Sequence, residues 1–218
     1  WDETYKLIYA LAPKTLVWGI GPSEARWIGN EEGRANETNW SLLRQKEELA
    51  GKVHYSEFMS GHEDGEKWVP GEADVSIRPG WFYHAVEDDK VRSLDELVAI
   101  YYESIGRNAN LLLNLPVDRR GLVHENDEAR LKELVATIKA DFKTELLSKT
   151  KITADNVRAN SETFAGKNAV DGNKNTYWAT DDKVKQATIE FTFKKPTAIN
   201  RILLQEYIKL GQRVKAFS

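Results

Sequence analysis

Tryptophan, arginine and carboxylate side chains gather in one stretch of this sequence, between Arg26 and His84. Five of the seven tryptophans lie between Trp18 and Trp81, where they are interleaved with Arg, His and Glu. A hydrophobic core seldom needs this mixture. A sugar site does, because flat aromatic faces pack on sugar C–H groups while charged side chains bind hydroxyls. The stretch therefore points to carbohydrate chemistry.

Glu31 is the carboxylate in this stretch whose setting best suits acid catalysis. It follows Asn30 in a polar loop that contains glycine, close to Trp27. Cleavage of a glycosidic bond needs one carboxyl group to protonate the departing oxygen and a second to attack or to activate water. Burial beside an indole raises the pKa of a carboxyl group, which suits an acid catalyst. The alternative is that Glu31 is a solvated loop charge, as an arbitrary loop glutamate usually is.

Other catalytic chemistries find less support. The histidines and acids between residues 54 and 84 lack the His-Glu-x-x-His spacing of zinc proteases, so we interpret His54 as polar lining of a sugar pocket. The chain has no Gly-x-Ser-x-Gly motif, which leaves a Ser/His/Asp triad without support. It also has no cysteine, which excludes thiolate catalysis and disulfides.

Composition excludes further classes. Lys plus Arg total 31 against 34 Asp plus Glu, a net charge of -3, which argues against a nucleic-acid-binding protein. No apolar run approaches the roughly 18 residues of a membrane span. The hydrophobic content of 41% is that of a globular protein.

The elements that must position Glu31 alternate between helix and strand. Residues 2–11 predict a helix stopped by Pro13, and residues 15–19 a short buried strand. Ser93 and Glu96 form a capping box before a second helix, residues 110–115 read as a buried strand, and a long helix follows. The pattern is α/β and predicts a partial (β/α)8-type barrel. A helix so close to residue 1 suggests that the chain begins partway through this fold.

Residues 150–218 have a different texture, rich in Thr, Asn, Val and Ile, with strand-like alternation at 188–193. This predicts an incomplete all-β jelly-roll sandwich. Within it, Asp171, Asn173 and Thr176 gather oxygen atoms in a tight turn, which suits either calcium or an ordinary Asx turn. Tyr177 and Trp178 could serve as a hydrophobic plug or as a sugar platform.

Several ordered strings of residues closely resemble those of retaining α-L-fucosidases of glycoside hydrolase family 29. The resemblance covers roughly residues 1–145 and is carried by residues 26–31, 38–41, 54–55, 68–72, 76–84, 106–108 and 113–116. It implies a barrel enzyme that releases terminal α-linked L-fucose from fucosylated oligosaccharides or glycoconjugates through a covalent intermediate. It also implies secretion or a periplasmic location.

The resemblance also assigns roles to residues. It implies that the acid/base is Glu31, with Glu37 and Glu72 as rivals, and that the pocket residues are Trp27, His54, Arg78 and Trp81. The family's aspartate nucleophile falls upstream of Trp1, so the chain alone is expected to be inactive. No cofactor is expected for catalysis. A carbohydrate-binding or adhesion protein with a non-catalytic barrel is the alternative.

Residues 150–218 are similar to the discoidin-like (coagulation-factor type C) β-sandwich. The carrying residues are 169–173, 176–179 and 205–215. The two resemblances together place a catalytic domain at residues 1–147 and a truncated sandwich at 148–218. They also imply a structural calcium ion held by Asp171, Asn173 and Thr176.

Overall fold

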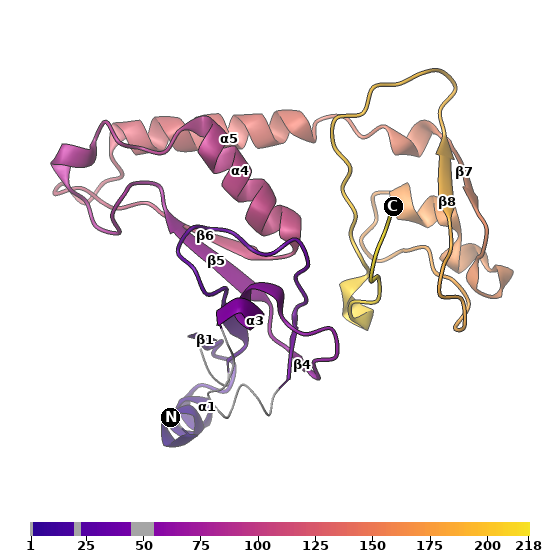
Figure 1. Ribbon diagram of the computed structural model, residues 1–218, viewed down its shortest axis with the longest axis horizontal. Helices are drawn as coiled ribbons and strands as arrows, with labels where there is room; N and C mark the ends of the chain where they lie inside the picture. The colour runs from indigo at the N-terminus through magenta and orange to yellow at the C-terminus, as the bar shows by residue number, and fades with distance from the viewer. Residues whose placement is uncertain (1, 20–22, 45–54) are drawn as a thin grey trace. The chain divides into compact units, whose positions relative to one another are not determined.

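The computed structural model describes residues 2–19, 23–44 and 55–218, in which contacts define two compact units, Trp1–Ile138 and Lys139–Ser218 (Figure 1). The first unit contains a parallel sheet with helices, and the second contains a two-stranded sheet with several short 3-10 helices. The helices and strands of the first unit are α1 (Asp2–Leu11), β1 (Trp18–Gly19), β2 (Ala25–Trp27), β3 (Leu42–Leu43), α3 (Tyr55–Ser60), β4 (Lys67–Trp68), β5 (Gly71–Ser76), η1 (Ala85–Glu87), α4 (Leu94–Ser104), η2 (Ile105–Arg107), β6 (Asn110–Asn114) and α5 (Glu125–Asp141).

Four of these strands form one sheet in the order β1-β2-β5-β6, and every neighbouring pair is parallel. Trp27 of β2 pairs with Glu72 of β5, which in turn pairs with Asn110 of β6. Strands β3 and β4 form a separate antiparallel pair. Because parallel strands all end at the same edge of a sheet, the loops after β2, β5 and β6 emerge together. This edge is where α/β proteins usually place their sites.

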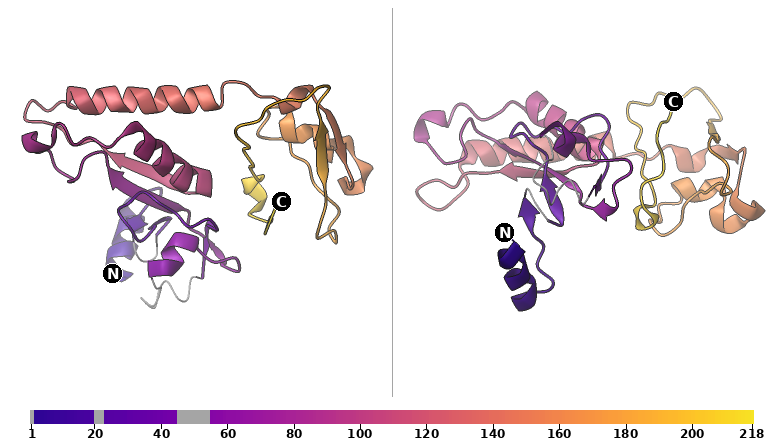
Figure 2. Two further views of the ribbon diagram at one scale, coloured as in Figure 1. Left: turned by 45° about the horizontal axis from the view of Figure 1, so that its top comes forward. Right: turned by 60° about the horizontal axis from the view of Figure 1, so that its bottom comes forward.

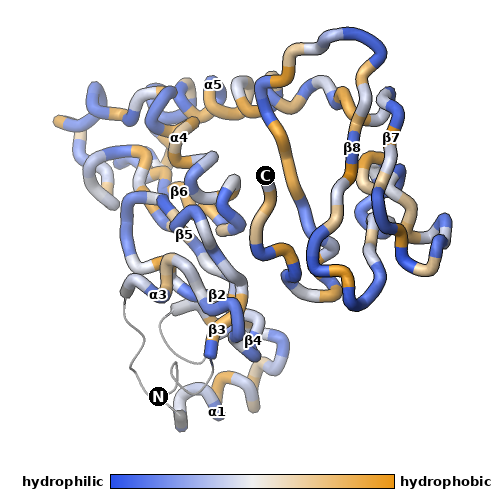
Figure 3. The backbone as a smooth tube through the Cα atoms, turned by 45° about the vertical axis from the view of Figure 1, so that its right-hand side comes forward, coloured by the Kyte–Doolittle hydropathy of each residue, from blue (hydrophilic) through white to orange (hydrophobic). Residues whose placement is uncertain are grey.

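Strand β5 separates a hydrophobic face from a polar one. Val75 of β5 and Ile77, which directly follows β5, are fully buried. They form one core with residues of α4 and α5. Figures 1 and 2 show α4 packed along β5 and β6, and Figure 3 shows that β6 and much of α4 are hydrophobic. Since side chains alternate along a strand, Glu72, Asp74 and Ser76 lie on the opposite face. The helices therefore cover one face of β5, and the polar row occupies the other.

Most of the predicted elements in this unit are confirmed. The helix over residues 2–11, the strand at 110–114 and the helix ending at Asp141 are present. The strand at 110–114 is not buried as predicted, because β6 is the last strand of the described sheet and its residues are half-buried or exposed. The capping box before α4 is complete, since Ser93 accepts from the Glu96 backbone and Glu96 reaches back to Ser93. The strand predicted at 15–19 is shorter, because only Trp18–Gly19 pairs with β2.

The second unit is built around β7 (Lys151–Ala154) and β8 (Ile189–Thr192), which pair antiparallel. Its 3-10 helices are η3 (Leu147–Lys149), η4 (Arg158–Asn160), η5 (Glu162–Phe164), η6 (Gly166–Val170) and η7 (Ile208–Leu210). The alternation predicted at 188–193 corresponds to β8. The apolar stretches at 199–204 and 214–217 carry no strand, and most of their large hydrophobic side chains are exposed.

Candidate active site

Glu31 and Trp81 meet at the edge where the parallel strands end. The Trp81 indole Nε1 donates a hydrogen bond to Glu31 Oε2 at 3.0 Å, although the two residues are 50 positions apart. Glu31 comes from the loop after β2, and Trp81 from the loop after β5. Glu31 is exposed, yet the indole fixes one of its carboxylate oxygens. The predicted acid is thus held by an aromatic neighbour at the edge of the sheet where β2 and β5 end.

Trp27 contacts a second carboxylate, Asp74, that lies on the polar face of β5. Its indole Nε1 donates to Asp74 Oδ1 at 2.7 Å. Asp74 is only 9% exposed. Burial raises the pKa of Asp74, the hydrogen bond from Trp27 opposes this rise, and the charge of Glu31 adds to it. The site therefore contains two carboxylates, each hydrogen-bonded to an indole.

Asp74 is not among the site residues predicted from the sequence; it is one of the acids between residues 54 and 84 that lack a metal-binding spacing. The signal was nevertheless present, because polar residues occupy every second position of Glu72-Ala73-Asp74-Val75-Ser76. Among the described residues, no group of three or more His, Cys, Asp or Glu side chains is placed to hold a metal ion.

The backbone of Trp81 is fastened to the neighbouring strand. Asn114, the last residue of β6, donates to the Trp81 carbonyl at 2.9 Å and to Ser76 Oγ at 3.0 Å. Ser76 Oγ in turn donates to the Gly80 carbonyl at 2.7 Å. These bonds hold the start of the loop after β5 against the sheet. Trp81 is therefore positioned by the ends of two strands.

Arg78 was predicted to bind substrate, but the structure places it in a buried ion-pair network. It is fully buried, and its Nε donates to both carboxylate oxygens of Asp127 at 3.0 and 2.8 Å. Its Nη1 lies 2.8 Å from Asp88 Oδ1, and its guanidinium lies 5.0 Å from the centre of the Tyr83 ring. These contacts tie the loop that carries Trp81 to the first turn of α5. Direct substrate binding by Arg78 stays a prediction.

The remaining predicted site residues differ in their surroundings where the structure describes them. His54 lies outside the described residues. Glu37 is exposed in the loop after β2. Glu72 is half-buried beside Asp74, and burial, followed by the charge of Asp74, raises its pKa. Glu72 thus stays a rival to Glu31 by its environment, whereas the Trp81 contact distinguishes Glu31.

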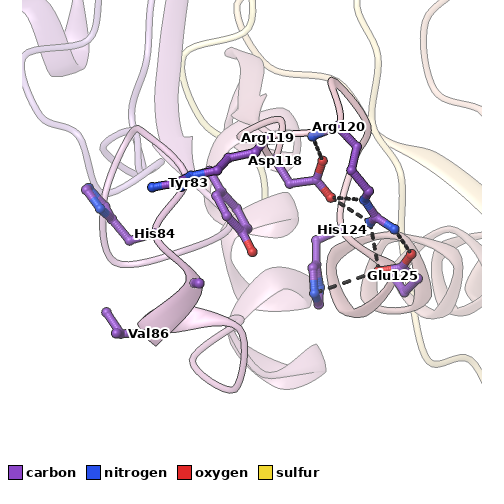
Figure 4. Close-up of a pocket in the computed structure, with 9 residues that line it drawn as sticks. Tyr83, His84, Val86, Asp118, Arg119, Arg120, His124 and Glu125 are labelled. Atoms are coloured by element: carbon purple, nitrogen blue, oxygen red, sulfur yellow. Dashed lines mark hydrogen bonds and ion pairs between the residues drawn. The ribbon is translucent and has the colours of Figure 1, made fainter.

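A hollow of about 610 Å³ lies between the loops after β5 and β6 (Figure 4). Arg120 lies between two acids there, donating from Nε to Asp118 at 2.8 Å and from Nη1 to Glu125 at 2.9 Å. The hydrogen bonds from Arg120 lower the pKa of both carboxyl groups. These acids hold their charge, so they suit binding rather than proton donation. The hollow is lined by Tyr83, His84, Ala85, Val86, Asp118, Arg119, Arg120, His124 and Glu125, none of which is a predicted site residue.

In the second unit, the turn predicted to bind calcium is closed by its own hydrogen bonds. Asp171 accepts from the Asn173 backbone at 2.8 Å and from the Thr176 hydroxyl at 2.6 Å, and the latter bond is the main cause of its lowered pKa. Nearby, the Tyr177 ring stacks on Tyr207 with centroids 4.3 Å apart. An aromatic partner thus covers one face of Tyr177, which favours the plug over the sugar platform.

None of the described helices is both long and apolar enough to cross a bilayer. The α-L-fucosidase family model matches residues 26–141, more than half of the chain, and the F5/8 type C domain model matches residues 151–218. Alpha-L-fucosidase 1 of Arabidopsis thaliana is 35% identical over 217 residues, which are 99% of this chain and 42% of that protein.

Solved structures of fucosidases are also similar to this chain. A candidate α-L-fucosidase from Bacteroides thetaiotaomicron is 38% identical, with a TM-score of 0.82 over 89% of this chain and 43% of that one. A Ruminococcus gnavus glycoside hydrolase family 29 fucosidase in complex with fucose is 32% identical, with a TM-score of 0.76 over 86% of this chain and 39% of that one. The chain spans less than half the length of these relatives. By the family match, it belongs to the α-L-fucosidase family.

Proposed function

We propose that this chain forms part of a retaining α-L-fucosidase and that Glu31 is its general acid/base. The observation that carries the proposal is the hydrogen bond from Trp81 to Glu31 at the edge where the parallel strands end. The indole fixes Oε2, while Oε1 has no partner among the described residues. That oxygen is the one available to deliver a proton to a glycosidic oxygen.

The reaction needs two carboxyl groups with different roles. Glu31 protonates the departing oxygen while the family's aspartate, which resemblance places upstream of Trp1, attacks the anomeric carbon. Glu31 then removes a proton from water as the covalent intermediate is hydrolysed. Retention of configuration requires these two groups to lie about 5–5.5 Å apart. The substrates we propose are fucosylated oligosaccharides or glycoconjugates, because fucose is bound in a related structure.

Replacing Glu31 by Gln in the full-length enzyme tests the assignment. Loss of a general acid/base costs about 10²–10⁴-fold in rate. We expect E31Q to lose this much turnover on an aryl α-L-fucoside with a poor leaving group. A good leaving group, which needs no protonation, should restore the first step, and azide should restore the second.

Two rival glutamates serve as matched controls. E37Q removes one charge from the same loop at an exposed position, and E72Q removes one from the polar face of β5. Neither variant should show azide rescue. Rescue of E37Q or E72Q, with E31Q unaffected, would reassign the acid/base. If the unaltered full-length protein shows no turnover, that result supports the alternative of a non-catalytic carbohydrate-binding protein.

We further propose a domain boundary between residues 147 and 148, a partial (β/α)8-type barrel before it and a truncated jelly-roll sandwich after it. The match to the α-L-fucosidase family ends at residue 141, and the match to the F5/8 type C domain begins at residue 151. These two limits support the division. We propose calcium binding by Asp171, Asn173 and Thr176, because hard cations prefer oxygen ligands and the Asp171 carboxyl keeps its charge. A secreted or periplasmic location is proposed from the family resemblance.

A further inference from the structure

Asp74 is a buried carboxylate for which the proposed reaction has so far had no use. It lies on the polar face of β5, on the C-terminal side of Glu72, and is 9% exposed. A buried carboxylate is stable only if hydrogen bonds or charges compensate it. The one described side chain that donates to Asp74 is the indole of Trp27. The indole N–H of Trp27 therefore offsets part of the cost of burying the Asp74 carboxylate.

The hydrogen bond between Trp27 and Asp74 links β2 to β5, and β2 leads into the loop that carries Glu31. Trp27 is the last residue of β2, and Glu31 follows it by four positions. The bond to Asp74 crosses from β2 to β5 on the face opposite the hydrophobic core. A ring held in this way cannot rotate freely, so it forms a fixed wall beside the loop that carries Glu31.

The charged groups that act on Asp74 from the described part of the chain are acidic. Two charged groups bear on Asp74, namely Glu31 from the loop after β2 and Glu72 from β5 itself. The β6 residues paired along this part of β5 include Asn110 and Asn114, which are neutral. Among the described side chains, no lysine or arginine forms an ion pair with Asp74. Like charges close together disfavour each other's ionised forms.

We propose that Asp74 is a positioning residue of the fucosidase site, which anchors the Trp27 indole beside the loop that carries Glu31 and places a second carboxylate near Glu31. The inference rests on the proposed function of Glu31. Because like charges disfavour each other's ionised forms, removal of the Asp74 charge should change the pH dependence of the reaction that Glu31 catalyses. The same carboxylate therefore serves both the geometry and the proton balance of the site.

The test compares three variants of the full-length enzyme by the pH dependence of kcat/KM. D74N keeps an oxygen that can accept from Trp27 but removes the charge, so the alkaline limb should move to lower pH by about 0.5–1 unit. W27F removes the donor, which leaves Asp74 more strongly protonated, so the limb should move in the same direction. D95N removes a charge from an exposed position in the first turn of α4 and should leave the profile unchanged.

The outcomes separate this inference from the proposed function. If E31Q behaves as an acid/base variant while D74N loses activity equally at every pH, Asp74 has only a structural role and the inference is overturned. An unchanged profile and unchanged rate in D74N overturn it as well. Should D74N fail to fold, as judged by circular dichroism, W27F decides by the same shift. A wild-type rate in E31Q removes the acid/base assignment itself, whatever D74N does.

Discussion

Loss of one partner of the buried ion pair between Arg78 and Asp127 is expected to destabilise the first unit. Both side chains are fully buried, and Arg78 Nε reaches both oxygens of Asp127. Burying two charges is unfavourable unless each stays paired, so removal of Asp127 leaves the buried guanidinium with the partly exposed Asp88 as its remaining charged partner. The change to test is therefore D127N, with D127A as the more severe form.

The magnitude follows from the bonds that each variant loses. D127N keeps one acceptor oxygen and loses one bond to a charged donor, worth about 1.5–3 kcal/mol. D127A loses both acceptors and the charge. Breaking a buried pair costs about 3–5 kcal/mol, and the remaining pair with Asp88 should keep the loss at the lower end of this range. Arg78 Nη2 has no hydrogen-bond partner among the described residues, so no second acceptor already stands ready there. The free energy of unfolding should fall in the order wild type, D127N, D127A.

Urea unfolding followed by tryptophan fluorescence and circular dichroism measures this loss. E133Q is the matched control, because Glu133 lies on the same helix and forms an exposed pair with Arg130 at a spacing of three residues. Such pairs contribute only about 0.2–0.5 kcal/mol. A loss for D127N no larger than that of E133Q would refute the reasoning. It would mean that the Arg78 network is hydrated in solution and does not anchor the loop that carries Trp81.

Four further predictions follow from the same contacts. G33A should destabilise the protein by about 1–3 kcal/mol, measured by urea unfolding, because Gly33 has φ +73° and a Cβ there would lie 2.8 Å from Val75 Cγ1. Asp88, whose pKa is lowered chiefly by its hydrogen bond with Arg78, should stabilise the fold above about pH 4 and lose that effect as pH falls further; in D88N, this part of the acid unfolding curve should flatten. Tyr9 has its pKa raised to about 12 by its hydrogen bond to Glu24, so its stabilisation should be complete below about pH 10 and vanish as pH rises towards 12; ultraviolet titration of wild type against Y9F detects it. Calcium should raise the unfolding temperature of the wild-type protein but not of D171A; no rise in either would leave the Asp171 turn as a plain Asx turn.

Local structure was largely predictable from the sequence. The capping box at Ser93 and Glu96, the apolar run of β6 and the spacing in α5 involve residues a few positions apart, so the backbone responds to them directly. Glu31 could likewise be selected, because its tryptophan-rich surroundings are visible in the printed sequence.

Contacts between distant segments were decided only by the tertiary structure. The parallel register of β2 and β5 brings Trp27 to Asp74, and the loops that follow these strands bring Trp81 to Glu31, 50 residues away. Arg78 stands in the same sequence block as the site residues, yet packing of α5 buries it against Asp127. A sequence pattern specifies the face of a strand on which a side chain lies. The partner it meets there depends on the strand register and on helix packing, which are set by the burial of the whole core.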